Sequence, residues 1–199
     1  SGDATTDADY NVGVGIGSLG ANTVGSKSTA IGTNTLFTQN PSSAADMFNT
    51  AMGYHAGFAV TTGTANTLIG GLAGDALTDA DYNVAIGTDA LTADTLGSNS
   101  VAVGVGALYT QNFTTATNAY NVAVGRSAGL SVTTGVKNTL IGGLAGDAMT
   151  IGFNNIAIGY DALGTNTASG ANVAIGYEAL KTYNHTTEAS LFNTAVGTQ

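Results

Sequence analysis

The sequence contains no cysteine and no tryptophan, and only four of its 199 residues are basic. Without cysteine, the chain can form neither disulfide bonds nor thiolate metal sites. The four cations and a formal net charge of −9 leave little to neutralise a phosphate backbone, so nucleic acid is not expected as a partner. No run of about 18 apolar residues occurs, so direct membrane insertion is not expected either. The N-terminus also lacks the pattern of a signal peptide.

Charged residues are scarce as well, at 9% of the chain, far below the roughly 25% of ordinary globular proteins. Disordered chains are highly charged and poor in β-branched residues, whereas 43% of this sequence is hydrophobic and it is dense in Val, Ile and Thr. The apolar residues are mostly small. The composition therefore predicts an ordered chain with a thin, closely packed interior.

The sequence repeats itself at an offset of 72 residues. The block from Thr67 to Thr78 returns from Thr139 to Thr150 with a single substitution. We therefore interpret residues 1–199 as one repetitive segment, with super-repeats at 11–82 and 83–154 and a partial one at 155–199. Because the chain begins without Met and in mid-pattern, we expect it to belong to a longer fibre.

Each super-repeat contains a shorter phrase, Asn-(Val/Thr)-(Ala/Leu)-(Ile/Val)-Gly-x-x-(Ala/Ser/Thr)-(Leu/Gly). It occurs eleven times, at intervals of 17, 21, 17 and 17 residues that then repeat, and Gly occupies the fifth position of every copy. The phrase begins at Asn11, Ser28, Asn49, Asn66, Asn83, Ser100, Asn121, Asn138, Asn155, Asn172 and Asn193.

A 17-residue unit is too short for a helix pair and suits one turn of a β-solenoid. Val84 and Ile86 would share one face of a short strand, with Ala85 on the other. The fifth-position Gly indicates a bend or a close backbone approach. The first-position Asn indicates a turn and a hydrogen-bonded ladder between turns. Each interior Gly would cost a helix about 1 kcal/mol, so the predicted fold class is all-β, a parallel β-solenoid or β-roll without long helices.

The phrases Asn83-Val-Ala-Ile-Gly and Asn172-Val-Ala-Ile-Gly resemble the head repeats of trimeric autotransporter adhesins of the YadA type, and also the repeat arrays of some phage tail-fibre shafts. The resemblance covers almost the whole chain. It implies a homotrimer with the Val and Ile columns packing the interior and small residues at the chain contacts. The turns here are longer than is usual in adhesin heads, and Leu or Gly follows the Ala. A thin roll also buries little apolar area, at about 25 cal/mol per Å², which independently favours association.

The sequence offers no convergent set of reactive groups. Its two histidines, His55 and His185, fall at different places in the super-repeat and have no partner constellation. We therefore expect no enzyme and no catalytic, cofactor-binding or metal site. The segment from Gly142 to Asp147 is similar to a calcium-binding nonapeptide with one residue displaced, so calcium dependence stays an open alternative.

The 21-residue turns carry the most variable segments, at 36–48, 108–120 and 180–192. They are rich in aromatic and hydroxyl side chains, and surface loops of this kind often carry binding. The candidates for contact with a glycan or protein receptor are Phe37, Tyr109, Phe113, Tyr183 and His185. Variable solvated loops without any partner are the alternative interpretation.

Taken together, the sequence predicts the shaft or head segment of an extracellular fibre, on a virion tail or a cell surface, that mediates host or surface attachment. A self-assembling extracellular filament without a specific receptor shares every one of these features. Ice binding is a third alternative, because Thr29, Thr50 and Thr67 share the second position of the phrase. Val or Ile interrupts that column in other turns, which argues against a matched ice-binding face.

Overall fold

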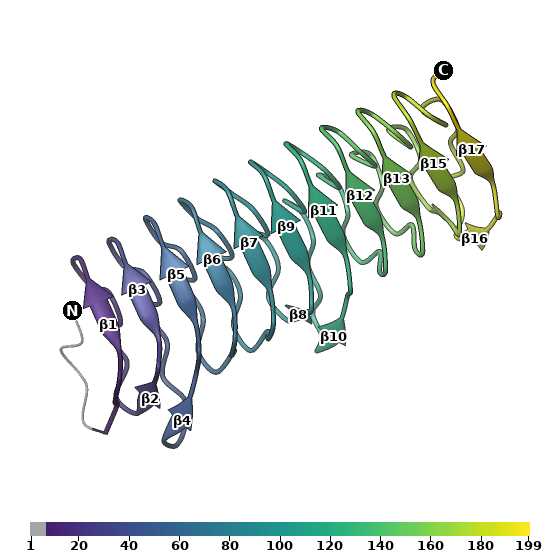
Figure 1. Ribbon diagram of the computed structural model, residues 1–199. Helices are drawn as coiled ribbons and strands as arrows, with labels where there is room; N and C mark the ends of the chain where they lie inside the picture. The colour runs from purple at the N-terminus through teal and green to yellow at the C-terminus, as the bar shows by residue number, and fades with distance from the viewer. Residues whose placement is uncertain (1–6) are drawn as a thin grey trace.

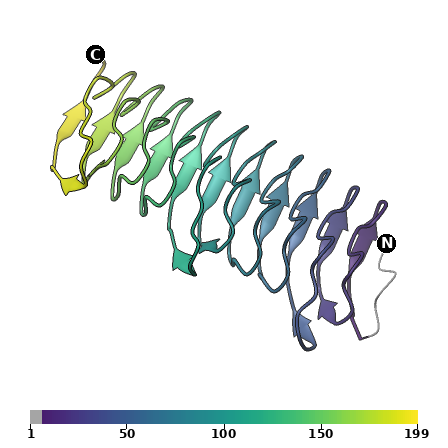
Figure 2. The same ribbon diagram turned by 180° about the vertical axis from the view of Figure 1, so that it is seen from behind.

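The computed structural model describes residues 7–199 as one continuous stack of turns along a common axis (Figure 1). The view from behind shows the same regular spacing, with the two ends of the chain at opposite ends of the stack (Figure 2). Residues 7–199 form strands, turns and bends and contain no helix. The predicted all-β parallel solenoid is therefore confirmed, including the absence of long helices within the described part.

The strands at the start of each phrase form one parallel sheet of eleven strands. Equivalent residues of successive phrases lie opposite one another, as Val84 does to Val101 and Ala85 to Ala102. The strands follow in chain order as β1 (Val12–Val14), β3 (Thr29–Ile31), β5 (Thr50–Met52), β6 (Thr67–Ile69), β7 (Val84–Ile86), β9 (Val101–Val103), β11 (Val122–Val124), β12 (Thr139–Ile141), β13 (Ile156–Ile158), β15 (Val173–Ile175) and β17 (Thr194–Val196).

Six further strands, of two residues each, form three pairs. In each pair, one strand belongs to a 21-residue turn and the other to the 17-residue turn before it. The pairs are β2 (Gly25–Ser26) with β4 (Ala45–Asp46), β8 (Gly97–Ser98) with β10 (Thr117–Asn118), and β14 (Ser169–Gly170) with β16 (Ala189–Ser190). Each pair lies at the edge of the stack from which the longer turn bulges (Figure 1). The four extra residues therefore widen one corner of the turn and leave the main sheet in register.

The interior is lined by the middle residue of each strand, which corrects the orientation that the resemblance implied. Ala85 and Ala102 are fully buried, whereas Val84 and Ile86 face outward and are only partly covered. These alanines belong to the same buried core as the ninth-position Leu91 and Leu108. The predicted sharing of one face by Val84 and Ile86 is right, and their placement in the interior is wrong.

The 72-residue period is a packing period of four turns. The ninth position of the phrase holds a buried Leu in two consecutive turns, then Gly57 and Gly74 in the next two. A Cβ on Gly57 would lie 2.7 Å from Cδ1 of Leu68, and one on Gly74 would lie 2.8 Å from Cδ2 of the same Leu. Leu68 in β6 thus fills, from the sheet side, the volume that a ninth-position Leu fills elsewhere. Leu140 does the same one super-repeat later.

All turns share one backbone conformation. In the described part of the chain, every residue with positive φ occupies one of four places, namely the residue before the phrase and its fifth, seventh and ninth positions. At the fifth position, Gly87 has φ +132°, and a Cβ there would lie 2.6 Å from the carbonyl oxygen of Gly104. The predicted close backbone approach at this Gly is confirmed.

The first-position Asn residues form the predicted ladder. Oδ1 of Asn83 accepts a hydrogen bond from the backbone N–H of Ser100, 2.9 Å away, while its Nδ2 donates to the carbonyl of Gly97. One 21-residue turn begins with Ser100 in place of Asn, and there the side chain of the buried Gln111 makes hydrogen bonds that continue the ladder. Its Nε2 donates to the Ser100 hydroxyl, and its Oε1 accepts from Nδ2 of Asn121. These buried amides satisfy backbone groups at one corner of each turn.

Candidate functional surfaces

Within residues 7–199, no three His, Cys, Asp or Glu side chains come close enough together to hold a metal ion. No helix of this part is long and apolar enough to cross a membrane. A shallow hollow lies between the last two turns, lined by Leu180, Lys181 and Val196 among others.

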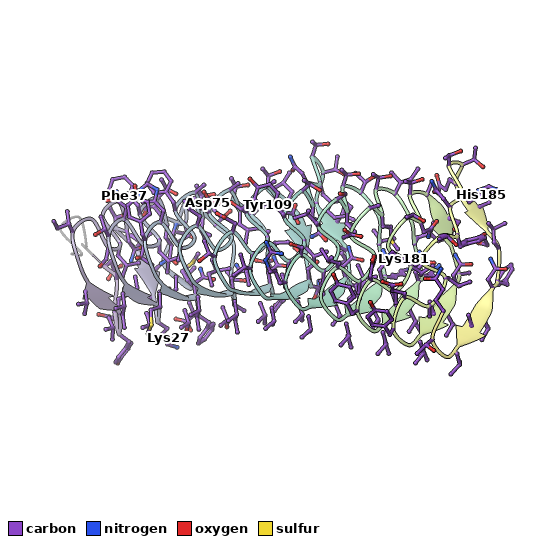
Figure 3. All side chains as sticks on the ribbon, turned by 90° about the horizontal axis from the view of Figure 1, so that it is seen from above. Lys27, Phe37, Asp75, Tyr109, Lys181 and His185 are labelled. Carbon is purple, nitrogen blue, oxygen red and sulfur yellow. The ribbon has the colours of Figure 1, made fainter. Side chains whose placement is uncertain are left out.

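The structure distributes the five predicted contact residues over three separate long turns. Phe37, Tyr109 and His185 lie on successive 21-residue turns (Figure 3). Four turns at about 4.8 Å each would separate them by roughly 19 Å, so they form no common site. Tyr109 is 42% exposed, whereas Phe113 is only 6% exposed and Tyr183 packs against the core.

The variable segments are less exposed than the sequence suggests. In the segment 108–120, Gln111 and Ala119 are fully buried in addition to Phe113. The longest run of consecutive exposed residues in each of the three segments is a triplet, at residues 42–44, 114–116 and 186–188. These triplets are the exposed tips of the long turns.

An aromatic stack joins the second and third turns, and the sequence interpretation missed it. The rings of Phe37 and Phe58 lie parallel with centroids 5.5 Å apart, and His55 stacks between Phe58 and Tyr54. Phe37 and Phe58 occupy equivalent positions of adjacent turns, one after the ninth phrase position. Alignment of the turns by register would have indicated this contact. The stack links the rings of two adjacent turns, and Tyr54 at its end is 58% exposed.

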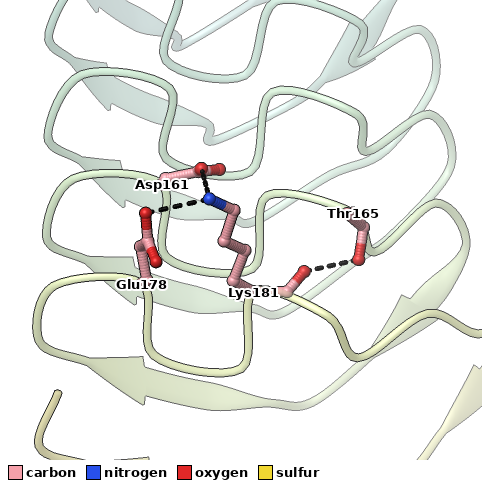
Figure 4. Close-up of polar contacts among 4 residues, drawn as sticks. All are labelled: Asp161, Thr165, Glu178 and Lys181. Carbon is pink, nitrogen blue, oxygen red and sulfur yellow. Dashed lines mark hydrogen bonds and ion pairs between the residues drawn. The ribbon is translucent and has the colours of Figure 1, made fainter. Parts of the chain in front are cut away.

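An ionic cluster connects the turns near the C-terminal end of the stack (Figure 4). Nζ of Lys181 lies 2.8 Å from Oδ2 of Asp161 and 2.9 Å from Oε1 of Glu178. These two carboxylates raise the pKa of Lys181, and the hydrogen bond from Lys181 lowers the pKa of Glu178. Nearby, burial raises the pKa of Asp147, whose Oδ1 has no hydrogen-bond partner. Lys181 occupies the place that Phe37 and Tyr109 occupy in the other long turns.

Asp94 is a buried carboxyl in the interior corner of a turn. Its Oδ2 accepts from Nε2 of Gln111 at 2.6 Å, and its Oδ1 accepts from the backbone N–H groups of Gly97 and Phe113. Burial raises the pKa of Asp94 in spite of these hydrogen bonds. The equivalent residues in the other super-repeats are the buried Asn22 and Asn166.

The outward side of the main sheet collects the exposed apolar side chains. Four positions of each turn form columns along this side: the residue before the phrase and the second, fourth and sixth positions of the phrase. We call these four columns together the outer sheet face. Within residues 7–199, nineteen large hydrophobic side chains are exposed, and all except Tyr109 and Ile151 belong to these columns. Contacts follow the columns from turn to turn, as between the stacked rings of Tyr160 and Tyr177, whose centroids are 5.7 Å apart.

The charges on the outer sheet face differ from those of the whole chain. None of the 13 Asp and Glu residues stands in any of the four columns, although the net charge is −9. Three of the four basic residues do, namely Lys27, Arg126 and Lys137. Lys27 projects on the strand side of the stack (Figure 3) and is paired with Asp46 at 2.6 Å. The face is therefore rich in apolar side chains, has no carboxylate residue in its columns and includes three of the four cations.

No family model, curated protein or solved structure matches this chain. Its fold places it in the class of parallel β-solenoids.

Proposed function

We propose that this chain is a shaft or head segment of an extracellular fibre, on a phage tail or a bacterial surface, in which three copies associate and which mediates attachment to a host or another surface. The observation that carries the proposal is the uninterrupted stack of eleven turns with one repeated backbone conformation. Such a stack gives reach along one axis, and at about 4.8 Å per strand its length is roughly 50 Å. The resemblance of the repeated phrase to adhesin heads and tail-fibre shafts supports the same function and the extracellular location.

Attachment is assigned to the exposed tips of the 21-residue turns. The triplets at 42–44, 114–116 and 186–188 are exposed, differ in sequence, and recur every four turns on a regular scaffold. Loops that vary on a constant frame are common carriers of binding. The chemistry of the tips, with Ser42, Thr114 and Thr186 among their residues, favours a hydrogen-bonding partner such as a glycan or a protein receptor.

The test replaces all three triplets with Gly and compares this variant with the unsubstituted chain. We expect a mass near three chains by sedimentation for both proteins and nearly equal Tm, because exposed tips make few buried contacts. Binding to an immobilised glycan array and to bacterial cells should be lost in the variant. A monomeric unsubstituted chain would contradict the trimer. An oligomeric chain without glycan or cell binding would instead favour the alternative of an extracellular filament without a receptor.

A further inference from the structure

We infer that the outer sheet face is the surface through which copies of this chain associate, parallel and in register. The inference rests on the proposed fibre and names the contact surface inside it. Exposed apolar side chains are concentrated on this face, which holds 17 of the 19 exposed large hydrophobic residues among residues 7–199. Contiguous exposed apolar patches of this kind mark interaction surfaces in soluble proteins.

The area of the face is sufficient for a stable interface. Eleven strands about 4.8 Å apart extend for roughly 50 Å, and the seven residues from the first column to the fourth span about 20 Å. The product is on the order of 1,000 Å² per copy, compared with about 800 Å² per partner in a standard protein interface. Even an interface that covers only part of the face would remove the two central columns, to which Val84 and Ile86 belong, from contact with water.

The repetitive geometry of the outer sheet face favours a second copy of this chain as its binding partner. A partner that covers the whole face has to present complementary columns at the pitch of a parallel sheet, over eleven successive turns. Another copy has the same pitch by construction, and its own face is apolar in the same columns. Closed symmetric association of identical chains is also the commonest form of oligomer.

Charge favours the same partner. The chain carries 13 carboxylates and a net charge of −9, which opposes association of copies through any acidic surface. The outer sheet face contains none of these carboxylates, and the Lys27 ammonium on it is already paired with Asp46. Two copies that meet through this face keep their acidic residues on the outside. Because charged residues are depleted at the cores of protein interfaces, the composition of the face fits this role.

The experiment places two lysines on the outer sheet face and, as a matched control, two outside its four columns in the same turns. The test variant is Ile69→Lys with Ile86→Lys, and the control is Ala76→Lys with Ala93→Lys. All four residues are partly exposed, so both variants should retain the β-rich circular dichroism spectrum. Sedimentation of the test variant should give the mass of a single chain, whereas the control should keep the mass of the unsubstituted oligomer.

A second measurement does not depend on the folding of the lysine variant. Because the chain has no cysteine, Val84→Cys and Ala93→Cys each introduce a single thiol. A short bis-maleimide should link copies through position 84, near the axis of a parallel assembly, and not through position 93. Equal linkage at the two positions, or an oligomer that survives the sheet-face lysines, would overturn this surface and leave the fibre standing. A monomeric unsubstituted chain would instead overturn the association itself.

Discussion

Gly87 shows how a single residue is fixed by backbone packing alone. Its φ of +132° lies in a region that side chains rarely adopt, and the carbonyl of Gly104 occupies the place where a Cβ would stand. Gly71, in the preceding turn, has neither constraint, since nothing lies within 4 Å of its Cβ position. The two residues therefore form a matched pair for substitution.

We expect Gly87→Ala to lower the free energy of unfolding by at least about 2 kcal/mol, because backbone strain of about 1–3 kcal/mol is added to a clash with backbone atoms. Gly71→Ala should change it by less than about 0.5 kcal/mol. Thermal unfolding followed by circular dichroism measures both. Similar Tm values for the two variants would contradict the assignment of Gly87 to a close approach.

Asp94 provides a pH-dependent contribution to stability. Burial raises its folded-state pKa above the ordinary value of 3.8, so the folded chain binds the proton more tightly than the unfolded chain. The contribution is complete below pH 3.8 and is lost as the pH rises through the raised pKa. Asp94→Asn removes this loss. The difference in Tm between Asp94→Asn and the unsubstituted chain should therefore increase from pH 4 to pH 7.

The reverse substitution is the control for this effect. Asn22 occupies the equivalent buried corner of the first super-repeat, so Asn22→Asp should introduce a second decline of Tm over the same pH range. Curves of Tm against pH that run parallel for all three proteins would show that burial of the carboxyl at this corner does not control stability.

At the scale of the element, each turn is a module whose interior has to match its neighbours. Leu68 in β6 is packed beneath Gly57 and Gly74 and takes the place of two ninth-position leucines. Leu68→Ala should cost about 2–5 kcal/mol of stability, since it leaves a cavity in a rigid interior. Gly74→Leu alone should also destabilise the chain, because the new side chain would overlap Leu68.

The double variant Leu68→Ala with Gly74→Leu reproduces the residues of the following turn, which has Ala85 in the middle of its strand and Leu91 at its ninth position. It should recover part of the stability lost in each single variant, and denaturant unfolding of the three proteins measures this coupling. Losses that simply add would mean that the two positions do not share one packing volume.

At the scale of the whole molecule, the super-repeat of four turns is the natural unit of length. Deletion of residues 83–154 removes one complete unit and joins Tyr82 to Asn155, an equivalent of Asn83. The shortened chain should keep the β-rich spectrum and a cooperative unfolding transition. Deletion of residues 66–82 removes one 17-residue turn together with Leu68, and it should lower Tm because Gly57 then lacks its packing partner. A smaller loss of Tm for the single-turn deletion than for the 72-residue deletion would contradict this packing period.

Much of the fold follows from the sequence because the repeat gives the same local information eleven times. The interval of 17 and 21 residues, the invariant Gly15 to Gly197 column and the first-position Asn residues predict the solenoid, the close approaches and the ladder. Each depends on contacts between equivalent residues of adjacent turns. Periodicity alone therefore determines which residues meet, without any knowledge of the tertiary structure.

Which side of each strand faces the interior was decided only by the tertiary structure. Both sides of β7 are apolar, with Val84 and Ile86 on one and Ala85 on the other, so alternation could not distinguish them. The same limit applies to Gln111 and Phe113, which lie in a polar segment and are nevertheless buried. The choice depends on volume, because Leu stands in the middle of a strand only where the ninth position is Gly, and Ala or Gly stands there where the ninth position is Leu. This packing volume depends on two separate parts of a closed turn, so the sequence of a single strand cannot indicate it.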